Sequence, residues 1–141
     1  MIGLSVLEEE LNKLEGNEYT EGGVSFYIVL ERLNITTEEN ETVRQYLRQL
    51  TLTGKAEYNN IEFCKLTLLE QGIDNLKKLF IEWHLEKDSV ERIISDLKTK
   101  HVSIYQFGQD YQYITQGTVS EIFRWICVDN EWYVLDFYIV D

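Results

Sequence analysis

Two arginines and two glutamines at helical spacing are the residues of this chain best suited to contact nucleic acid. Arg44 and Arg48 are four residues apart, which places them on one stripe of a helix, with Gln45 and Gln49 beside them. Arginine contacts phosphates and guanine edges in the major groove, and glutamine contacts adenine. Lysines follow in a predicted hairpin. The candidate DNA-binding residues are Arg44, Gln45, Arg48, Gln49, Lys55 and Lys65.

Glutamates in the same stretch favour a different partner. Three of them precede the helix, where they suit the positive end of its dipole but would repel DNA phosphate. They can also pair with Arg44 and Arg48 on a solvated helix face. An exposed acidic ridge, in contrast, can bind a basic protein as a nucleic-acid mimic. The candidate partner-binding residues in this alternative are Glu38, Glu39, Glu41, Glu57 and Glu62.

The elements that would position these residues are a helix and a hairpin. Apolar residues repeat at helical spacing in the helix, at Val43, Tyr46, Leu47 and Leu50. Gly54 ends it, and two short strands, 55–58 and 61–66, flank the turn pair Asn59-Asn60. Segment 67–72 then leads out of the hairpin.

This order resembles a winged helix-turn-helix domain over residues 1–80. The residues that carry the resemblance are Leu33-Asn34-Ile35-Thr36 as the inter-helix turn, Thr42-Val43-Arg44 and Leu47-Arg48-Gln49-Leu50 as the second helix, Gly54-Lys55-Ala56 entering the wing, and Leu66-Thr67 with Gly72 leaving it. The resemblance implies a transcription-regulator-like protein that binds double-stranded DNA. The winged helix also serves in protein and RNA binding, so the fold alone does not assign a function.

The remaining N-terminal residues are expected to complete this domain with helices. Leucines at three- and four-residue spacing predict an amphipathic helix over 2–15. Residues 20–23, Thr-Glu-Gly-Gly, are interpreted as a loop. The apolar run 24–33 fits a helix or a buried strand, and the spacing of Phe26, Val29, Leu30 and Leu33 favours a helix.

The C-terminal part, residues 81–141, is predicted to be a separate unit of helix and antiparallel sheet. Helical patterns over 73–84 and 89–97, the second capped by Asp88, precede a four-stranded antiparallel meander. Its predicted strands are 102–107, 111–115, 119–128 and 132–140, with Asp129-Asn130 in the last turn. The fold class is therefore α+β, an N-terminal winged helix followed by helices and a four-stranded β-meander.

The last hairpin of this meander is apolar on both faces. One face can pack on helices, and the other needs a cover from the N-terminal domain or from a partner chain. The pattern predicts a homo-oligomer, such as a dimer, or a partner bound through the C-terminal sheet. The helix-then-sheet order also resembles the latter half of a cystatin-like, nuclear-transport-factor-type cone, which implies a small-molecule or enzymatic pocket.

Charge weighs against ordinary DNA binding. The chain has 25 acidic and 13 basic residues, a net charge of −12. Residues 1–75 contain 14 acidic and 6 basic residues, so the predicted DNA-binding half is the more acidic one. Because DNA affinity comes largely from lysines and arginines at phosphates, this balance favours a basic protein partner.

No catalytic or cofactor-binding motif is recognisable, and the sequence predicts a non-enzymatic protein without cofactor or metal. Glu82, His84 and Glu86 do not share one helix face, so they are interpreted as a polar edge rather than a metal site. Asp136 lies in an apolar strand. If buried, it would have a raised pKa and could mark a site, but exposure at an edge or a cross-strand pair with Arg124 is the favoured interpretation. Tyrosines in the C-terminal half are interpreted as core and interface.

The cysteines and the hydropathy of the sequence indicate the cellular compartment of the protein. Cys64 and Cys127 stand in strand-like stretches and are expected to be small buried residues. No run reaches the roughly 18 apolar residues of a membrane helix, and residues 1–10 lack the charge order of a secretory signal. The sequence predicts a cytoplasmic protein without membrane contact.

Overall fold

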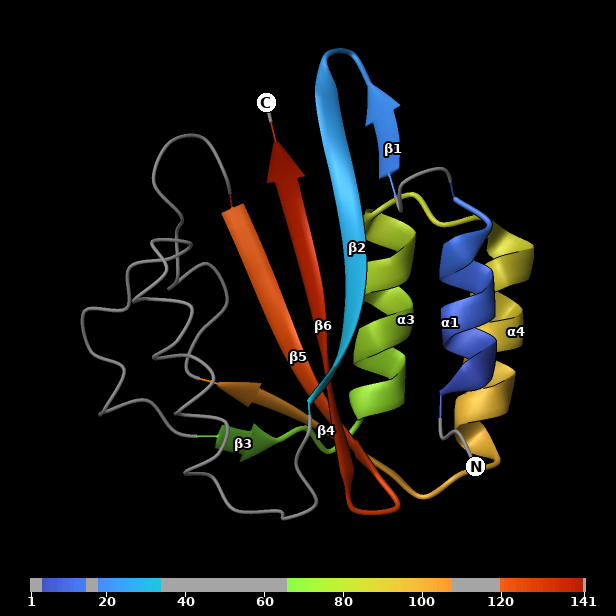
Figure 1. Ribbon diagram of the computed structural model, residues 1–141, viewed down its shortest axis with the longest axis vertical. Helices are drawn as coiled ribbons and strands as arrows, with labels where there is room; N and C mark the ends of the chain where they lie inside the picture. The colour runs from blue at the N-terminus through green and yellow to red at the C-terminus, as the bar shows by residue number, and fades with distance from the viewer. Residues whose placement is uncertain (1–3, 15–17, 34–65, 108–119, 141) are drawn as a thin grey trace.

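The computed structural model describes residues 4–14, 18–33, 66–107 and 120–140. These residues form one antiparallel sheet with helices packed on one of its faces (Figure 1). The elements in chain order are α1 Ser5–Asn12, β1 Glu18–Glu21, β2 Val24–Leu33, β3 Leu66–Leu68, α3 Gly72–Glu82, α4 Lys87–Lys98, β4 Val102–Phe107, β5 Ser120–Val128 and β6 Glu131–Val140. The sheet has six strands in the order β1-β2-β6-β5-β4-β3.

Two tight turns set the register of the sheet. Asp129 and Asn130 have φ values of 51° and 62° and join β5 to β6, as predicted. Gly22 and Gly23, with φ of 61° and 82°, join β1 to β2 in the same way. Positive φ at both turn residues is the type I′ geometry, whose twist matches that of the flanking strands. Both hairpins then meet at the centre of the sheet, where β2 pairs with β6.

The core lies between the helices and one face of this sheet. Alternate residues of β6 face the helices, and Phe137 is the most central of them, with an exposed fraction of 0%. Its ring centroid lies 5.6 Å from that of Phe80 and 5.5 Å from that of Trp83, both from the α3 end of the helical layer. α4 packs against α3, and α1 packs against α4, so the three helices form one layer (Figure 1).

The second face of the sheet is buried as well. The side chains that define this face in β5 and β6 have exposed fractions of 0–5% and are Phe123, Trp125, Cys127, Trp132 and Val134. This is the second aromatic face of the last hairpin, for which the sequence predicted a cover from the N-terminal domain or a partner chain. It is buried within a single chain. The prediction of a buried Cys127 is confirmed. Self-association through the C-terminal sheet stays a prediction.

The predicted fold class is wrong. The chain does not form an N-terminal winged helix followed by a four-stranded meander, because strands from both ends of the chain build one six-stranded sheet. Three predicted C-terminal strands are present as β4, β5 and β6, but β6 pairs with β2 on its other side. The predicted strand 111–115 lies outside the described residues, as does the whole helix and hairpin of segment 34–65.

The helix predicted over residues 24–33 is also wrong, because this run is strand β2. It pairs with β1 on one side and with nine residues of β6 on the other. A strand inside a sheet with apolar neighbours on both faces carries a continuous apolar run, which hides the two-residue period. The helices predicted around 2–15, 73–84 and 89–97 are confirmed as α1, α3 and α4. Asp88 lies inside the first turn of α4, and the N-cap is Glu86.

A buried carboxylate joins α1 to α4. Glu10 has an exposed fraction of 2%, and its carboxylate oxygens accept hydrogen bonds from Lys13 Nζ at 2.7 Å and Arg92 Nη2 at 3.1 Å. The Lys13 hydrogen bond chiefly, with help from Arg92 and against the effect of burial, lowers the pKa of Glu10 from 4.5 to about 2. Both cations are half exposed, so solvent screens part of this interaction.

Acid is therefore expected to destabilise the α1–α4 contact. The pKa of Glu10 is lower in the folded state than in the unfolded chain. The stabilisation from the Glu10 ion pairs is therefore complete above pH 4.5 and is lost as the pH falls towards about 2. Glu10→Gln should lower the free energy of unfolding at pH 7 by about 2 kcal/mol and should remove this part of the acid sensitivity. Urea unfolding at pH 7 and pH 3 measures both effects. An unchanged pH dependence in the variant would contradict this role of Glu10.

Candidate functional site

The functional residues predicted from the sequence lie outside the described part of the chain. All six candidate DNA-binding residues and all five candidate partner-binding glutamates fall within 34–65. Their arrangement stays a prediction. The described residues instead bring tyrosines, glutamates and a histidine together at the border of the sheet.

We call this region the hairpin edge, and it consists of strand β1 with the side chains that pack around it. The described sheet ends at β1 on this side (Figure 1), and β1 has only four residues. The residues of the hairpin edge are Glu18, Tyr19, Thr20, Glu21, Phe26, Tyr27, His84 and Tyr138. Each face of β1 carries one tyrosine–glutamate pair.

The first pair lies on the sheet face that points away from the helices. The Tyr27 hydroxyl donates a hydrogen bond to Glu18 Oε2 at 2.5 Å, and the residues are cross-strand neighbours. The Tyr27 ring stacks on Tyr138, with centroids 4.7 Å apart and planes 11° from parallel. The hydrogen bond to Glu18 raises the pKa of Tyr27, so the phenol keeps its proton and holds the carboxylate in place.

The second pair lies on the face that carries the helices. The Tyr19 hydroxyl donates to Glu21 Oε2 at 3.3 Å, and the charge of Glu21 raises the pKa of Tyr19. The Tyr19 ring stacks on the exposed imidazole of His84, with the ring centroids 4.5 Å apart and the planes 17° from parallel. Phe26 meets the same imidazole edge-on at 4.6 Å. These contacts fix the hairpin against the turn between α3 and α4.

His84 has a backbone conformation that few side chains adopt. Its φ of 66° lies in the left-handed region, at the position after the helix cap where glycine is usual. The N–H of Leu85 donates to the carbonyl of Phe80 and the N–H of His84 donates to that of Ile81, both at 3.0 Å, which is the Schellman pattern. A non-glycine residue here costs roughly 1 kcal/mol, and the two ring contacts of the imidazole offset it.

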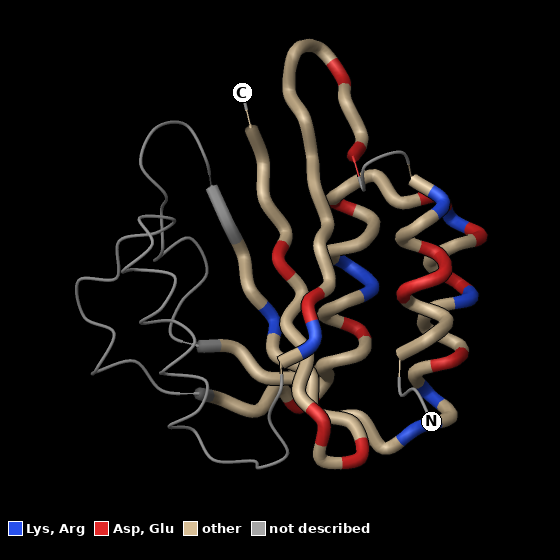
Figure 2. Tube along the Cα trace, in the orientation of Figure 1, with Lys and Arg blue, Asp and Glu red and all other residues tan. Residues whose placement is uncertain are grey.

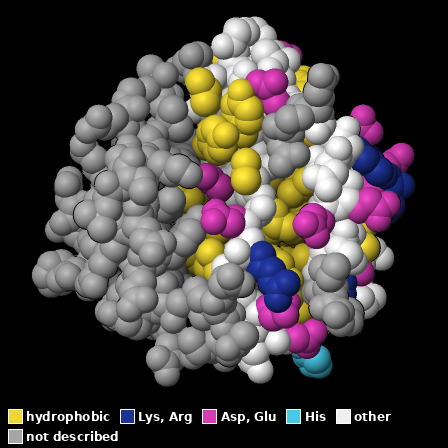
Figure 3. Space-filling model, in the orientation of Figure 1, with side chains coloured by type: hydrophobic (Ala, Val, Ile, Leu, Met, Phe, Trp, Pro, Cys, Tyr) yellow, Lys and Arg dark blue, Asp and Glu magenta, His cyan; other side chains and the backbone are white. Residues whose placement is uncertain are grey.

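The charge of the hairpin is negative near its turn, and its only cation, Arg32 at the far end of β2, pairs with Glu131. Residues 18–31 contain three glutamates and no lysine or arginine. Figure 2 shows acidic positions at both ends of β1, whereas lysines and arginines alternate with acids on the helices. In Figure 3, hydrophobic side chains gather near the free ends of the hairpin and β6, with acidic side chains beside them. Aromatic rings next to carboxylates favour lysine and arginine as ligands.

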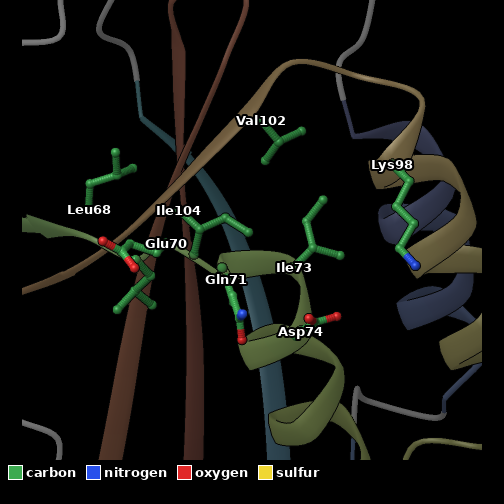
Figure 4. A pocket seen from close by; sticks show the side chains of 10 residues that line it. Leu68, Glu70, Gln71, Ile73, Asp74, Lys98, Val102 and Ile104 are labelled. Carbon is green, nitrogen blue, oxygen red and sulfur yellow. The ribbon is translucent and has the colours of Figure 1, made fainter.

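A cleft at the start of α3 is a second candidate site (Figure 4). It has a volume of about 300 Å³ and is open to solvent. Aliphatic side chains of α3, β3 and β4 line part of it, and the polar side chains come from Glu70, Gln71, Asp74 and Lys98. These groups have mixed charge and do not converge on one point (Figure 4). The cleft therefore lacks the convergent polar groups that mark a specific small-molecule site.

Gly72, which lines the cleft, lies where α3 touches β4. A Cβ atom at this position would lie 2.7 Å from Ile104 Cβ and 3.2 Å from Ile104 Cδ1. The Cβ atom of Ile104 is bonded directly to the backbone of β4, so side-chain rotation cannot move it away. Glycine is therefore required by the close approach of the helix to the strand.

Arg124 and Asp136 do not form the expected cross-strand pair. The register places Arg124 opposite Leu135 and places Asp136 opposite Phe123, so the two charged side chains leave the sheet on opposite faces. Arg124 has an exposed fraction of 1%, and its Nε donates to Asn75 Oδ1 on α3 at 2.8 Å. This arginine joins a helix to the sheet, which is a structural role.

Comparison with known proteins adds no family. The chain matches no protein-family model, no curated protein and no solved structure. Within the described ranges, no helix is long and apolar enough to cross a membrane. Over those same ranges, histidine, cysteine and carboxylate side chains do not gather in the groups of three that could hold a metal ion.

Sequence reasoning missed the hairpin edge, although a signal for it was present. Gly22-Gly23 stands between Tyr19-Thr20, two residue types that favour strands, and the apolar run from Val24. A two-residue Gly-Gly turn between such runs predicts a type I′ hairpin. Interpreting 24–33 as a helix removed one of its strands.

Proposed function

We propose that this protein is a non-enzymatic interaction module that binds a basic segment of a partner protein through the hairpin edge. The single observation that carries the proposal is the presence of one tyrosine–glutamate pair on each face of β1. In each pair the phenol holds the carboxylate, so the acceptor is oriented before a ligand arrives. Preorganised acceptors lose less conformational entropy when they bind.

The composition of the chain supports the same partner class. A net charge of −12 attracts basic surfaces and repels nucleic acid at long range. The hairpin concentrates this charge beside aromatic rings, which also attract arginine and lysine. DNA binding through residues 34–65 stays a separate prediction, and the same titration tests it.

The test is a fluorescence-anisotropy titration of the protein into labelled probes at about 50 and about 200 mM salt, a range that reveals charge-dependent binding. The probes are a peptide of sequence Thr-Arg-Val-Thr-Arg-Val and a mixed-sequence DNA duplex. We expect the peptide to bind, with weaker affinity at the higher salt, and the duplex not to bind. Binding of the duplex alone would contradict the proposal and favour a DNA-binding regulator.

Matched charge variants show whether the hairpin edge is responsible. Replacing Glu18 and Glu21 with glutamine keeps an oxygen acceptor for each tyrosine and removes two charges. We expect this variant to lose about fivefold to tenfold in peptide affinity, the effect of two exposed ion pairs. The control replaces Glu8 and Glu91, which are exposed on α1 and α4, and changes net charge equally. Equal losses in both variants would mean that charge acts without a site.

A further inference from the structure

Building on the proposed function, we infer how the partner binds: an extended basic segment adds as a further strand to β1, on the side where the described residues place no other strand. The inference rests on the backbone of β1, on the like charge of its side chains and on their spacing. Peptides that extend an exposed sheet edge gain affinity from main-chain hydrogen bonds and specificity from alternate side chains. The hairpin edge provides both.

The backbone of β1 has groups available for such a strand. In a two-residue hairpin the residues next to the turn, Glu21 and Val24, form a hydrogen-bonded pair, and such pairs alternate along the ladder. Tyr19 therefore also directs its N–H and C=O towards β2. Glu18 and Thr20 direct theirs away from β2, and Thr20 is exposed. These outward groups can pair with an incoming strand.

Charge determines which strand can bind. A second copy of β1 would bring its own glutamates against Glu18 and Glu21, and like charges on neighbouring strands are destabilising. Acidic side chains on an edge strand thus prevent self-pairing. A segment that carries lysine or arginine replaces this repulsion with cross-strand ion pairs. The edge therefore selects a basic partner over another copy of this chain.

The spacing of the glutamates predicts the spacing of the basic residues. Glu18 lies on the face with Tyr27, and Glu21 lies on the opposite face with Tyr19, because they are three residues apart in a strand. A neighbouring strand lies about 4.8 Å away, with its side chains alternating in the same way. Basic residues at positions i and i+3 of the added strand would each meet one carboxylate. Residues at i and i+2 would both lie on one face and meet only one.

Two peptides of identical composition test this geometry. Thr-Arg-Val-Thr-Arg-Val places its arginines at i and i+3, and Thr-Arg-Val-Arg-Thr-Val places them at i and i+2. We expect the first to bind the full chain about threefold to fivefold more tightly, the effect of one additional cross-strand ion pair. Equal affinities would overturn strand addition, while a loss of binding on replacing Glu18 and Glu21 would still support the proposed function. Failure of both peptides to bind would contradict the proposed function itself.

Removing one backbone donor provides an independent test. Thr20→Pro deletes an outward N–H at a position where an edge strand tolerates proline. Thr20→Ala is the control, since both variants lose the hydroxyl that lies 3.0 Å from Ser25 Oγ. We expect Thr20→Pro to weaken peptide binding about fivefold relative to Thr20→Ala, the effect of one hydrogen bond.

Peptides that are N-methylated at alternate amides check the same bond without altering the protein. Methylation in one of the two alternating registers should abolish binding, because it blocks the amides that face β1. Methylation in the other register should be tolerated. Tolerance of methylation in both registers would overturn strand addition, even if Thr20→Pro had failed to fold.

Discussion

Replacing Phe137 with alanine is expected to lower the free energy of unfolding by about 4 kcal/mol, the largest effect of any single substitution considered for this chain. Phe137 is fully buried at the centre of β6 and contacts Phe80 and Trp83 from the helical layer. Alanine would leave a cavity between the sheet and the helices that rigid neighbours cannot fill. Urea or thermal unfolding measures this loss.

Val140→Ala provides the control for the Phe137 prediction. Val140 is in the same strand but is only partly buried, near its end. We expect this variant to lose less than about 1 kcal/mol, because a small and partly exposed group is removed. Similar costs for the two substitutions would mean that Phe137 does not lie in the main core, and the helix-on-sheet packing would need revision.

Gly72→Val is expected to destabilise the protein by about 3 kcal/mol through overpacking. A Cβ atom at this position would meet Ile104 Cβ at 2.7 Å, so α3 would have to move away from β4. The two methyl groups of valine would add to this clash. Chemical unfolding measures the effect, and circular dichroism confirms that helix content is retained.

Lys77→Val separates this clash from the helix propensity of valine. Lys77 is exposed on the same helix, so its replacement carries mainly the cost of a β-branched residue, roughly 0.5 kcal/mol. The difference between the two variants is then the effect of the contact with Ile104. Equal effects would show that α3 does not approach β4 as closely as described.

Local pattern was sufficient to predict the amphipathic helices and one hairpin. The leucines of α1 and the apolar face of α4 repeat at helical spacing, and that period survives because each helix buries one side only. Asp129-Asn130 allows positive φ, and it marked the turn between β5 and β6. These features depend on residues close in sequence.

The order of strands in the sheet could not be predicted in this way. β2 and β6 pair although roughly a hundred residues separate them, as the ion pair between Arg32 and Glu131 illustrates. The hydrophobic periodicity of either strand alone does not indicate which distant strand it pairs with. β2 also has apolar residues on both faces, so its pattern was compatible with a helix. The resemblance to a winged helix rested instead on residues 33–72, most of which lie outside the described part of the chain.

The candidate site depended on this strand order. Glu18 and Glu21 are unremarkable acids in sequence, and they gain a role only because β1 lies at the border of the sheet. The stacking of Tyr19 on His84 likewise joins segments about sixty residues apart in the chain. Sequence reasoning weighed the glutamates of 34–65 instead, and their role stays a prediction.

The most direct test of the central claim is an NMR titration of the ¹⁵N-labelled protein with Thr-Arg-Val-Thr-Arg-Val. Binding at the hairpin edge predicts that the amide signals of 18–21 shift, with the largest changes at Glu18 and Thr20, whose N–H groups gain a hydrogen-bond partner. Saturating shifts at these residues would support a basic segment paired with β1. Shifts confined to 34–65 or to the helices, with the amides of β1 unchanged, would contradict the account.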